Sequence, residues 1–245
     1  MRIGVTLPTF RDDAYALDAA REAEHLGLDG VFVFDHLWPM GKPGRPALSA
    51  MPVLGAVCAV TERVTVGSLV ARIGLLPDEL LVESLTSLDV VSGGRFVAGL
   101  GTGDRLSEEE NLTYGIRYAP REERLASLRW CATRLLDAGL TVWVGGRGQT
   151  VSLAEEIGAV VNLWGAGPEE IASIRSRDLI EVTWGGVAGK GPGRPPDPSP
   201  AQIVDHLTEI GNAGATWAVS VWPASPGQFA EVAGEVRRRL GSVGI

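Results

Sequence analysis

The fold is decided by residues 88–104, which read LDVVSGGRFVAGLGTGD. Gly93 and Gly94 supply the positive φ angles that end a helix and reverse the chain. The apolar run 96–98 lies between turn signals, which is typical of a strand covered on both faces. Beyond it, glycines leave the backbone bare as far as Asp104, so a ligand can approach closely. Because α/β folds place their sites at the carboxyl ends of parallel strands, we expect a site in this loop.

Strands and helices alternate on both sides of this stretch. Apolar runs bounded by turn residues predict strands at 2–7, 30–34, 64–70, 96–98, 141–144, 159–163, 179–184 and 217–222. Eight such repeats predict a (β/α)8 TIM barrel, and since no composition break marks a second domain, residues 1–245 are expected to form one domain. A doubly wound open sheet is the alternative. Residues 105–120 are polar and are expected to be irregular, with the acids at 108–110 in solvent.

The composition narrows the class of protein. Of 245 residues, 45% are hydrophobic and 21% are charged, which suits a globular chain with a large core. A net charge of −8 with no basic stripe argues against a nucleic-acid partner. No apolar run is long enough to span a membrane, no cysteine spacing is typical of a metal site, and the chain starts directly with a strand. We therefore expect a cytoplasmic protein with a small-molecule partner and no metal.

One histidine follows a predicted strand directly. The chain has three histidines, of which His25 lies in the last turn of a predicted helix and His206 on a charged helix, where it is expected to be exposed. His36 comes at once after the second strand, beside Asp35, which is placed to fix its tautomer. An imidazole there is a candidate general acid or base. The alternative is a rim histidine that only makes hydrogen bonds.

Two glycine-rich loops also follow strands. Gly101, Thr102 and Gly103 imitate a dinucleotide-binding fingerprint, but the glycine spacing is wrong and no helix clearly follows.

The second loop is the better candidate. Gly145, Gly146, Arg147 and Gly148 lie between a strand and a helix, where bare amides and the helix N-terminus bind anions. The loop lacks the Gly-Lys-Ser/Thr ending of a nucleoside triphosphate loop, so a phosphate that tethers a cofactor is the expected occupant. A plain tight turn is the alternative.

Tryptophans gather near the predicted strand ends. Of the seven in the chain, Trp164, Trp184 and Trp222 end strands and Trp38 lies just beyond another. Four indoles converging on one rim would indicate a flat aromatic ligand or an apolar substrate, whereas core filling explains any one of them.

Several of these motifs together resemble one known family. They are GLDGVFVFDH at 27–36, RVTVG at 63–67, LDVVSGGRF at 88–96 with the GTG at 101–103, VWVGG at 142–146 and SPAQIV at 199–204. This order of motifs resembles the bacterial-luciferase-like flavin and deazaflavin oxidoreductases, the luciferase-like monooxygenase family. The resemblance implies a (β/α)8 barrel that holds an isoalloxazine-type ring in its mouth.

The Asp-His pair after the second strand resembles the branch that uses coenzyme F420, a deazaflavin that moves hydride without activating oxygen. The resemblance implies that Asp35 contacts the ring and His36 transfers the proton. Asp104 stands where sugar-phosphate dehydrogenases of that branch carry Glu, so it is expected to orient or charge the site. The leading hypothesis is an F420-dependent oxidoreductase, and an FMN-linked monooxygenase is the alternative.

The resemblance also implies a non-prolyl cis peptide in the third strand that supports the ring. The matching residues are Ser68, Leu69 and Val70.

The chain is shorter than this family. Excursions that help roof the substrate pocket in relatives are reduced here to one helix before the fifth strand and a Gly/Pro loop at 185–200. The substrate and the direction of reaction are therefore not identified, and a non-catalytic cofactor-binding or partner subunit is a third hypothesis. Apolar helices at 47–60 and 78–91 predict a homodimer.

Overall fold

The computed structural model describes residues 1–10, 15–39, 42–177 and 180–241. In these ranges nine parallel strand segments form one sheet in the order β3-β2-β1-β9-β8-β7-β6-β5-β4. The strands are β1 Arg2–Thr6, β2 Gly30–Val33, β3 Thr65–Ser68, β4 Ala71–Arg72, β5 Phe96–Gly101, β6 Thr141–Gly145, β7 Val160–Trp164, β8 Val182–Gly186 and β9 Trp217–Val221. A further pairing of β3 with β5 closes the sheet, so the predicted (β/α)8 barrel is confirmed.

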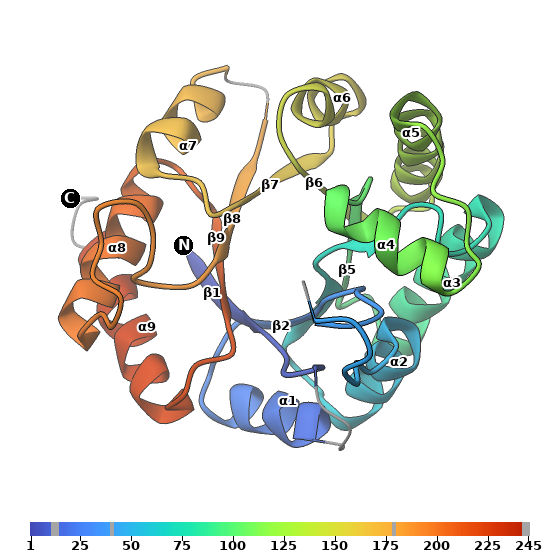
Figure 1. Ribbon diagram of the computed structural model, residues 1–245. Helices are drawn as coiled ribbons and strands as arrows, with labels where there is room; N and C mark the ends of the chain where they lie inside the picture. The colour runs from blue at the N-terminus through green and yellow to red at the C-terminus, as the bar shows by residue number, and fades with distance from the viewer. Residues whose placement is uncertain (11–14, 40–41, 178–179, 242–245) are drawn as a thin grey trace.

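Most of the helices surround the barrel as an outer ring, whereas α4 lies inward of α3 and α5 in this view (Figure 1). The helices are α1 Tyr15–His25, α2 Ala50–Val60, α3 Asp78–Ser92, α4 Arg105–Thr113, α5 Arg121–Asp137, α6 Gln149–Ile157, α7 Pro168–Arg175, α8 Pro200–Asn212 and α9 Pro226–Gly241. None of the helices in the described ranges is long and apolar enough to cross a membrane.

The third strand position of the barrel, called here the third stave, is made of two segments, β3 and β4. The sequence predicts one strand at 64–70, but pairing is interrupted between β3 and β4, where a non-prolyl cis peptide joins Leu69 and Val70. β3 pairs with β5 through Val66 and Gly67, and β4 resumes the pairing at Ala71. The cis bond therefore lies where the resemblance places it.

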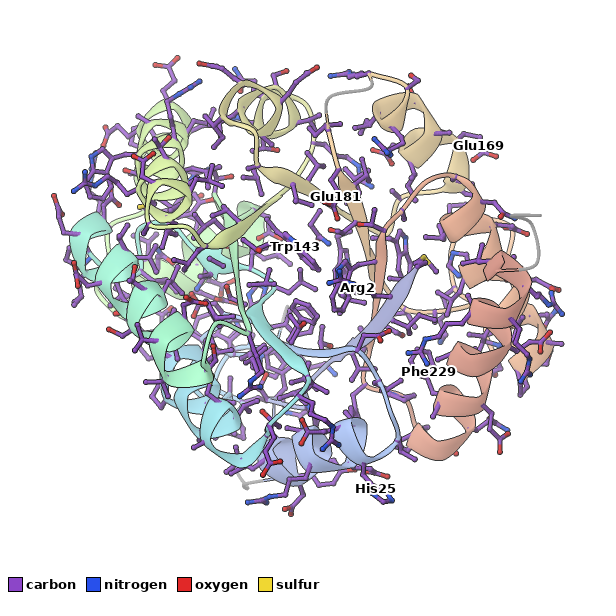
Figure 2. All side chains as sticks on the ribbon, turned by 180° about the vertical axis from the view of Figure 1, so that it is seen from behind. Arg2, His25, Trp143, Glu169, Glu181 and Phe229 are labelled. Atoms are coloured by element: carbon purple, nitrogen blue, oxygen red, sulfur yellow. The ribbon has the colours of Figure 1, made fainter. Side chains whose placement is uncertain are left out.

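Aromatic rings fill the lower part of the barrel. Phe32 stacks on Trp143 with ring centroids 5.1 Å apart, and Trp217 meets Phe32 edge to face. Glycines on neighbouring strands make room for them, since a Cβ on Gly67 would lie 2.7 Å from the Phe32 ring. Figure 2 views the molecule from the other end, with Trp143 inside the ring of strands. This aromatic layer fills the interior of the barrel below the carboxyl ends of the strands.

Two predictions about secondary structure are wrong. The stretch from Arg105 to Thr113, expected to be irregular, is helix α4, and Asp104 caps it. The seventh strand, expected at 179–184, is β8 over Val182–Gly186, and position 179 lies outside the described residues. Both differences change which side chains reach the mouth.

Candidate active site

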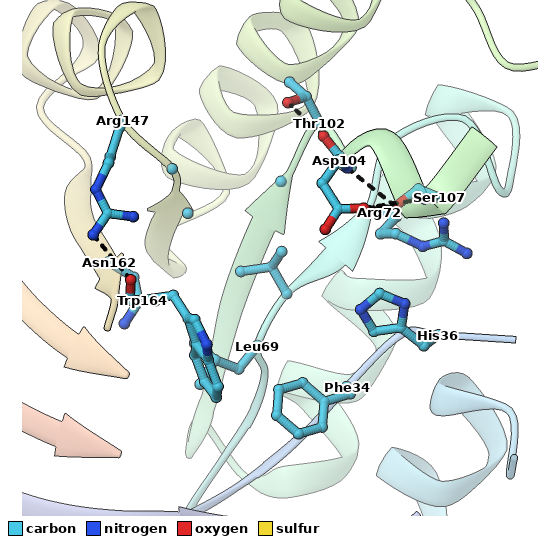
Figure 3. A pocket seen from close by; sticks show the side chains of 15 residues that line it. Phe34, His36, Leu69, Arg72, Thr102, Asp104, Ser107, Arg147, Asn162 and Trp164 are labelled. Carbon is cyan, nitrogen blue, oxygen red and sulfur yellow. Dashed lines mark hydrogen bonds between the residues drawn. The ribbon is translucent and has the colours of Figure 1, made fainter. Parts of the chain in front are cut away.

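A cavity of about 340 Å³ lies at the carboxyl ends of the strands, above the aromatic layer. The loop after β2, the third stave, α4 and the ends of β5, β6 and β7 with the loops that follow them form its walls (Figure 3). The described residues that line it are Phe34, His36, Leu69, Val70, Arg72, Gly101, Thr102, Gly103, Asp104, Ser107, Gly145, Gly146, Arg147, Asn162 and Trp164. The expectation that the site lies at the strand ends therefore agrees with where the cavity is found.

The floor of the cavity depends on contacts between Val70 and the glycines. The hydroxyl of the fully buried Ser68 donates to the carbonyl of Gly99 at 2.8 Å. A Cβ on Gly101 would lie 2.4 Å from a methyl of Val70, and a Cβ on Gly145 would lie 2.9 Å from the other. These glycines are thus required by the close approach of the third stave, which the sequence alone attributed to a ligand. The cofactor role predicted for residues 68–70 and 101–103 stays a prediction.

His36 enters the cavity from the loop after β2, with 16% of its side chain exposed. Its Nδ1 lies 2.9 Å from Oε1 of Glu110 on α4. Its Nε2 has no hydrogen-bond partner among the described residues. The sequence suggested Asp35 as the residue that fixes the His36 tautomer, and this is corrected, because Glu110 makes the contact.

Asp35 is instead bound to the third stave. Its carboxylate accepts a hydrogen bond from the backbone N–H of Arg72 at 3.0 Å, and its carbonyl accepts one from Arg72 Nε at 2.7 Å. Burial raises the pKa of the Asp35 carboxyl, although the hydrogen bond and charge of Arg72 oppose the shift. Asp35 is not among the residues that line the cavity, and its contact with a cofactor ring stays a prediction.

Glu110 is the functional candidate that sequence analysis missed. It was expected in solvent with its acidic neighbours, but its side chain is completely buried. The carboxylate accepts from His36 through Oε1 and from the backbone N–H of Leu37 through Oε2 at 3.1 Å. Burial alone would raise the pKa of this carboxyl, but the hydrogen bond and charge of His36, the Leu37 amide and Arg72 outweigh it, so the pKa is lowered. Glu110 is therefore held as a carboxylate.

Helix α4 buries its polar face, which explains why sequence analysis did not predict the burial of Glu110. Ser107, Glu110 and Asn111 are buried, whereas Leu106 and Leu112 are 40% and 62% exposed. Positions i, i+3 and i+4 lie on one face of a helix, so the spacing of Ser107, Glu110 and Asn111 was readable once a helix was assumed. A polar stretch with outward leucines gives no amphipathic signal for burial, and the acids were taken for a solvated run.

Arg72 joins β4 to the same network. Its Nη2 lies 2.8 Å from Glu110 Oε2, an ion pair without the alignment of a hydrogen bond, and its Nη1 donates to Asn111 at 3.3 Å. The Arg72 side chain is 4% exposed. Because neither charge reaches bulk water, each neutralises the other's burial cost.

Asp104 is the N-cap residue of α4 at the edge of the cavity. Its Oδ1 accepts hydrogen bonds from the backbone N–H of Leu106 at 2.9 Å and of Ser107 at 3.0 Å. With the Ser107 hydroxyl bound to the Asp104 N–H, these bonds form a capping box that begins α4. Asp104 thus positions the helix that carries Glu110, and its predicted part in turnover stays a prediction.

The loop after β6 joins a strand to the N-terminus of a helix, as the sequence predicts. Gly146 and Gly148 have φ angles of +137° and +60°, and Gly148 is the N-cap residue of α6. Arg147 lines the cavity and forms an exposed ion pair with Glu170, Nε to Oε1 at 2.6 Å. The phosphate-binding role predicted for these amides and the helix N-terminus stays a prediction.

The structure brings one of the four predicted tryptophans to the cavity. Trp164 lines it and meets Phe34 edge to face at 5.4 Å. Trp184 is 1% exposed because β8 continues beyond it, and its Nε1 donates to the carbonyl of Ala166 in the outer layer. Trp38 packs beside Tyr114, and Trp222 beside Tyr15. The expected convergence of four indoles on one rim is therefore wrong.

His206 is also corrected, since it is buried and not exposed. Its Nδ1 accepts the backbone N–H of Gly189 at 2.8 Å, and its ring meets Trp184 edge to face at 5.3 Å. Burial, with the charge of Arg194, lowers the pKa of His206 to about 4. The histidine holds the loop after β8 onto α8, away from the cavity. No group of His, Cys, Asp and Glu suited to a metal ion occurs among the described residues.

Comparison with known proteins shows which family this chain resembles. Residues 1–182 match the luciferase-like monooxygenase family. A curated relative, the F420-dependent glucose-6-phosphate dehydrogenase of Microbacterium testaceum, is 35% identical over 132 residues, which is 54% of this chain and 37% of the relative. The matched part of the chain thus spans little more than a third of that relative's length.

Solved structures share the whole fold at low sequence identity. An F420-dependent secondary alcohol dehydrogenase in complex with an F420-acetone adduct matches with a TM-score of 0.79 at 14% identity, covering 96% of this chain and 99% of that one. An F420-dependent tetrahydromethanopterin reductase from Methanopyrus kandleri matches with a TM-score of 0.75 at 14% identity, covering 98% and 99%. At this identity the likeness concerns the fold alone.

Proposed function

We propose that this chain, which belongs to the luciferase-like monooxygenase family, is an oxidoreductase that transfers a hydride between coenzyme F420 and a small organic substrate. The observation that carries the proposal is the placement of His36. It is a titratable side chain in the cavity, beside the cis peptide at Leu69 and Val70 and facing bare glycine backbone. The name of the Microbacterium testaceum relative supports the choice of deazaflavin.

The residues present fit a flat ring with an anionic tail. Phe34, Leu69, Val70 and Trp164 give the cavity apolar surfaces for a ring. The amides at 145–148 and the N-terminus of α6 would hold a phosphate. When bound, the deazaflavin supplies hydride transfer without oxygen activation.

His36 would move the proton that accompanies hydride transfer. In the oxidation of an alcohol, the C–H bond is broken as a hydride and the hydroxyl proton must pass to a base. Nε2 of His36, which has no partner among the described residues, is the group we assign to that proton. In the reverse direction the same atom returns the proton to the carbonyl oxygen.

Asp104 and Trp164 are proposed contacts at the rim of the cavity. Only Oδ1 of Asp104 has hydrogen-bond partners among the described residues, so Oδ2 is left to orient or charge the substrate. Trp164 offers a flat apolar face on the opposite side, as Figure 3 shows. Trp38, Trp184 and Trp222 lie outside the described lining, so we do not assign them to the substrate.

We propose a substrate without a phosphate group. Two arginines line the described cavity, and Arg72 is enclosed with Glu110. Arg147 lies beside the amides at 145–148, and since an exposed ion pair is worth only about 0–1 kcal/mol, a cofactor phosphate can recruit it from Glu170. This leaves no guanidinium in the described lining for a second phosphate, which favours a small secondary alcohol or ketone.

The test is turnover of F420 with two substrates. Loss of the F420 absorbance on addition of 2-propanol, with no loss on addition of glucose 6-phosphate, is the expected result. Turnover of glucose 6-phosphate alone would overturn the substrate class while leaving the oxidoreductase. No F420 binding combined with FMN binding would favour the FMN-linked monooxygenase, and binding without turnover across a panel of alcohols would favour a non-catalytic subunit.

A homodimer and a cytoplasmic location also stay proposals. Leu80, Val90 and Val91 on α3 are 51%, 74% and 62% exposed, and such apolar residues suit a buried interface. Sedimentation should give a dimer, and Val90→Glu should give a monomer, whereas Val187→Glu at another exposed valine should not. A monomeric wild type at micromolar concentration would overturn the proposal.

A further inference from the structure

A buried carboxylate on one segment contacts an imidazole, a backbone amide and a guanidinium from two others. His36 and Leu37 come from the loop after β2, Arg72 from β4, and Glu110 itself from α4. Oε1 of Glu110 contacts the His36 ring, and Oε2 receives the Leu37 amide and the Arg72 guanidinium. The Glu110 side chain has no exposed surface, so water cannot substitute for any of these donors.

An ionised carboxylate can only accept hydrogen bonds. The ring nitrogen that faces it must therefore carry a proton, because two acceptors 2.9 Å apart would leave both buried groups unsatisfied. In the neutral imidazole the other nitrogen is then bare. That nitrogen, Nε2, belongs to a ring that lines the cavity.

We propose that Glu110 is a positioning residue that fixes the proton of His36 on Nδ1 and so presents a bare Nε2 to the cavity. Arg72 and the Leu37 amide hold the carboxylate in place from its other oxygen. When Nε2 takes up a proton, the same carboxylate lies against the imidazolium and stabilises its charge. The consequence for turnover rests on the proposed role of His36, but the proton position itself does not.

The Glu110→Gln variant distinguishes a residue that fixes the position of the His36 proton from one that only contacts the ring. A glutamine has one acceptor and one donor end in place of two acceptors. Its oxygen satisfies more donors at the Oε2 position, where Leu37 and Arg72 converge, which turns its amide N–H toward Nδ1 of His36. Nδ1 must then be bare, and the proton moves to Nε2.

The experiment is nitrogen NMR of the imidazoles in the ligand-free protein, which needs neither cofactor nor substrate. The chain has three histidines, so His25→Asn and His206→Asn variants assign the His36 signals. In the wild type we expect the His36 proton on Nδ1, and in Glu110→Gln on Nε2. Glu109→Gln, which makes the same change on an exposed neighbour, should leave the wild-type pattern.

A wild-type proton on Nε2, or a proton that stays on Nδ1 in Glu110→Gln, would overturn the proposal. If Glu110→Gln does not fold, the position of the His36 proton in the wild type still tests the proposal. Titration of F420 into the same samples tests the proposed function separately from the position of the His36 proton. Lack of F420 binding would contradict the proposed function but would not change where the proton lies.

Discussion

Nδ1 of His36 lies 2.9 Å from Oε1 of Glu110, although 74 positions of sequence separate the two residues. The contact joins the loop after β2 to α4, and Arg72 adds β4 through Oε2 of the same carboxylate. Asp104 begins α4 with its capping box and so fixes where Glu110 enters. His36 is thus held by a network that joins the loop after β2, β4 and α4.

His36→Asn should slow turnover strongly without unfolding the protein. The asparagine amide can still donate toward Glu110, so the buried carboxylate keeps its partners, but it cannot exchange a proton. We expect a rate lower by about 10²–10⁴, the range for losing a general acid or base, with a nearly unchanged thermal midpoint and F420 affinity. The matched control is His25→Asn on the exposed end of α1. A His36→Asn enzyme with the wild-type rate would contradict the assignment.

Arg72 and Glu110 should be strongly coupled in stability. Removing one partner of a buried ion pair leaves an uncompensated charge and costs about 3–5 kcal/mol, whereas replacing both with apolar residues costs much less than the sum. We therefore expect Arg72→Met and Glu110→Leu to be individually destabilising, and the double variant to recover part of the loss. Urea unfolding of the four proteins measures the cycle. Strictly additive losses would mean that the 2.8 Å contact carries no coupling.

His206 should make the protein sensitive to mild acid. Its pKa falls from 6.5 to about 4 on folding, so between these values the unfolded chain binds a proton that the folded protein does not. Stability from this group is full above pH 6.5 and is lost as the pH falls toward 4, by roughly 3 kcal/mol at 1.36 kcal/mol per pKa unit.

The measurement is the free energy of unfolding against pH for the wild type, His206→Asn and His25→Asn. His206→Asn should be less stable at pH 7 but flatter between pH 6.5 and 4. A variant with the wild-type slope would show that another group titrates there.

Gly99 and Gly234 should respond to alanine with opposite signs. A Cβ on Gly99 would lie 2.0 Å from the carbonyl oxygen of Ser68, so the third stave must shift. We expect Gly99→Ala to cost about 3 kcal/mol, as overpacking of a fixed core does. Gly234 lies within α9 with nothing within 4 Å of an added Cβ, so Gly234→Ala should stabilise by about 0.5–1 kcal/mol. Equal effects in urea unfolding would contradict the close approach of Ser68.

The barrel was predictable because its strands are short apolar runs separated by turn residues. The motif around Gly93 and Gly94 predicted the helix end and the turn, since Gly93 is the left-handed C-cap of α3. The strand predicted at 96–98 is longer in the structure, because β5 pairs with β6 as far as Gly101. A run of apolar residues does not say where pairing stops, however. β8 continues to Gly186, which leaves Trp184 within the strand and turns its side chain to the outer layer.

The site was predictable only in part. His36 and the loop at 145–148 follow strand ends, and the strand ends form the mouth. Arg72 follows the third predicted strand, but its ion pair with Glu110 was not predicted and Glu110 itself was missed, because burial of a charge depends on partners that lie far away in sequence. The residues next to Glu110 did not indicate its burial, since α4 exposes Leu112 and buries Asn111.

Equilibrium binding of F420 to the purified protein, with FMN as the competitor, tests the central claim most directly. We expect that F420 binds, that FMN does not displace it at equal concentration, and that His36→Asn binds F420 as the wild type does. Binding of FMN with no measurable binding of F420 would contradict it.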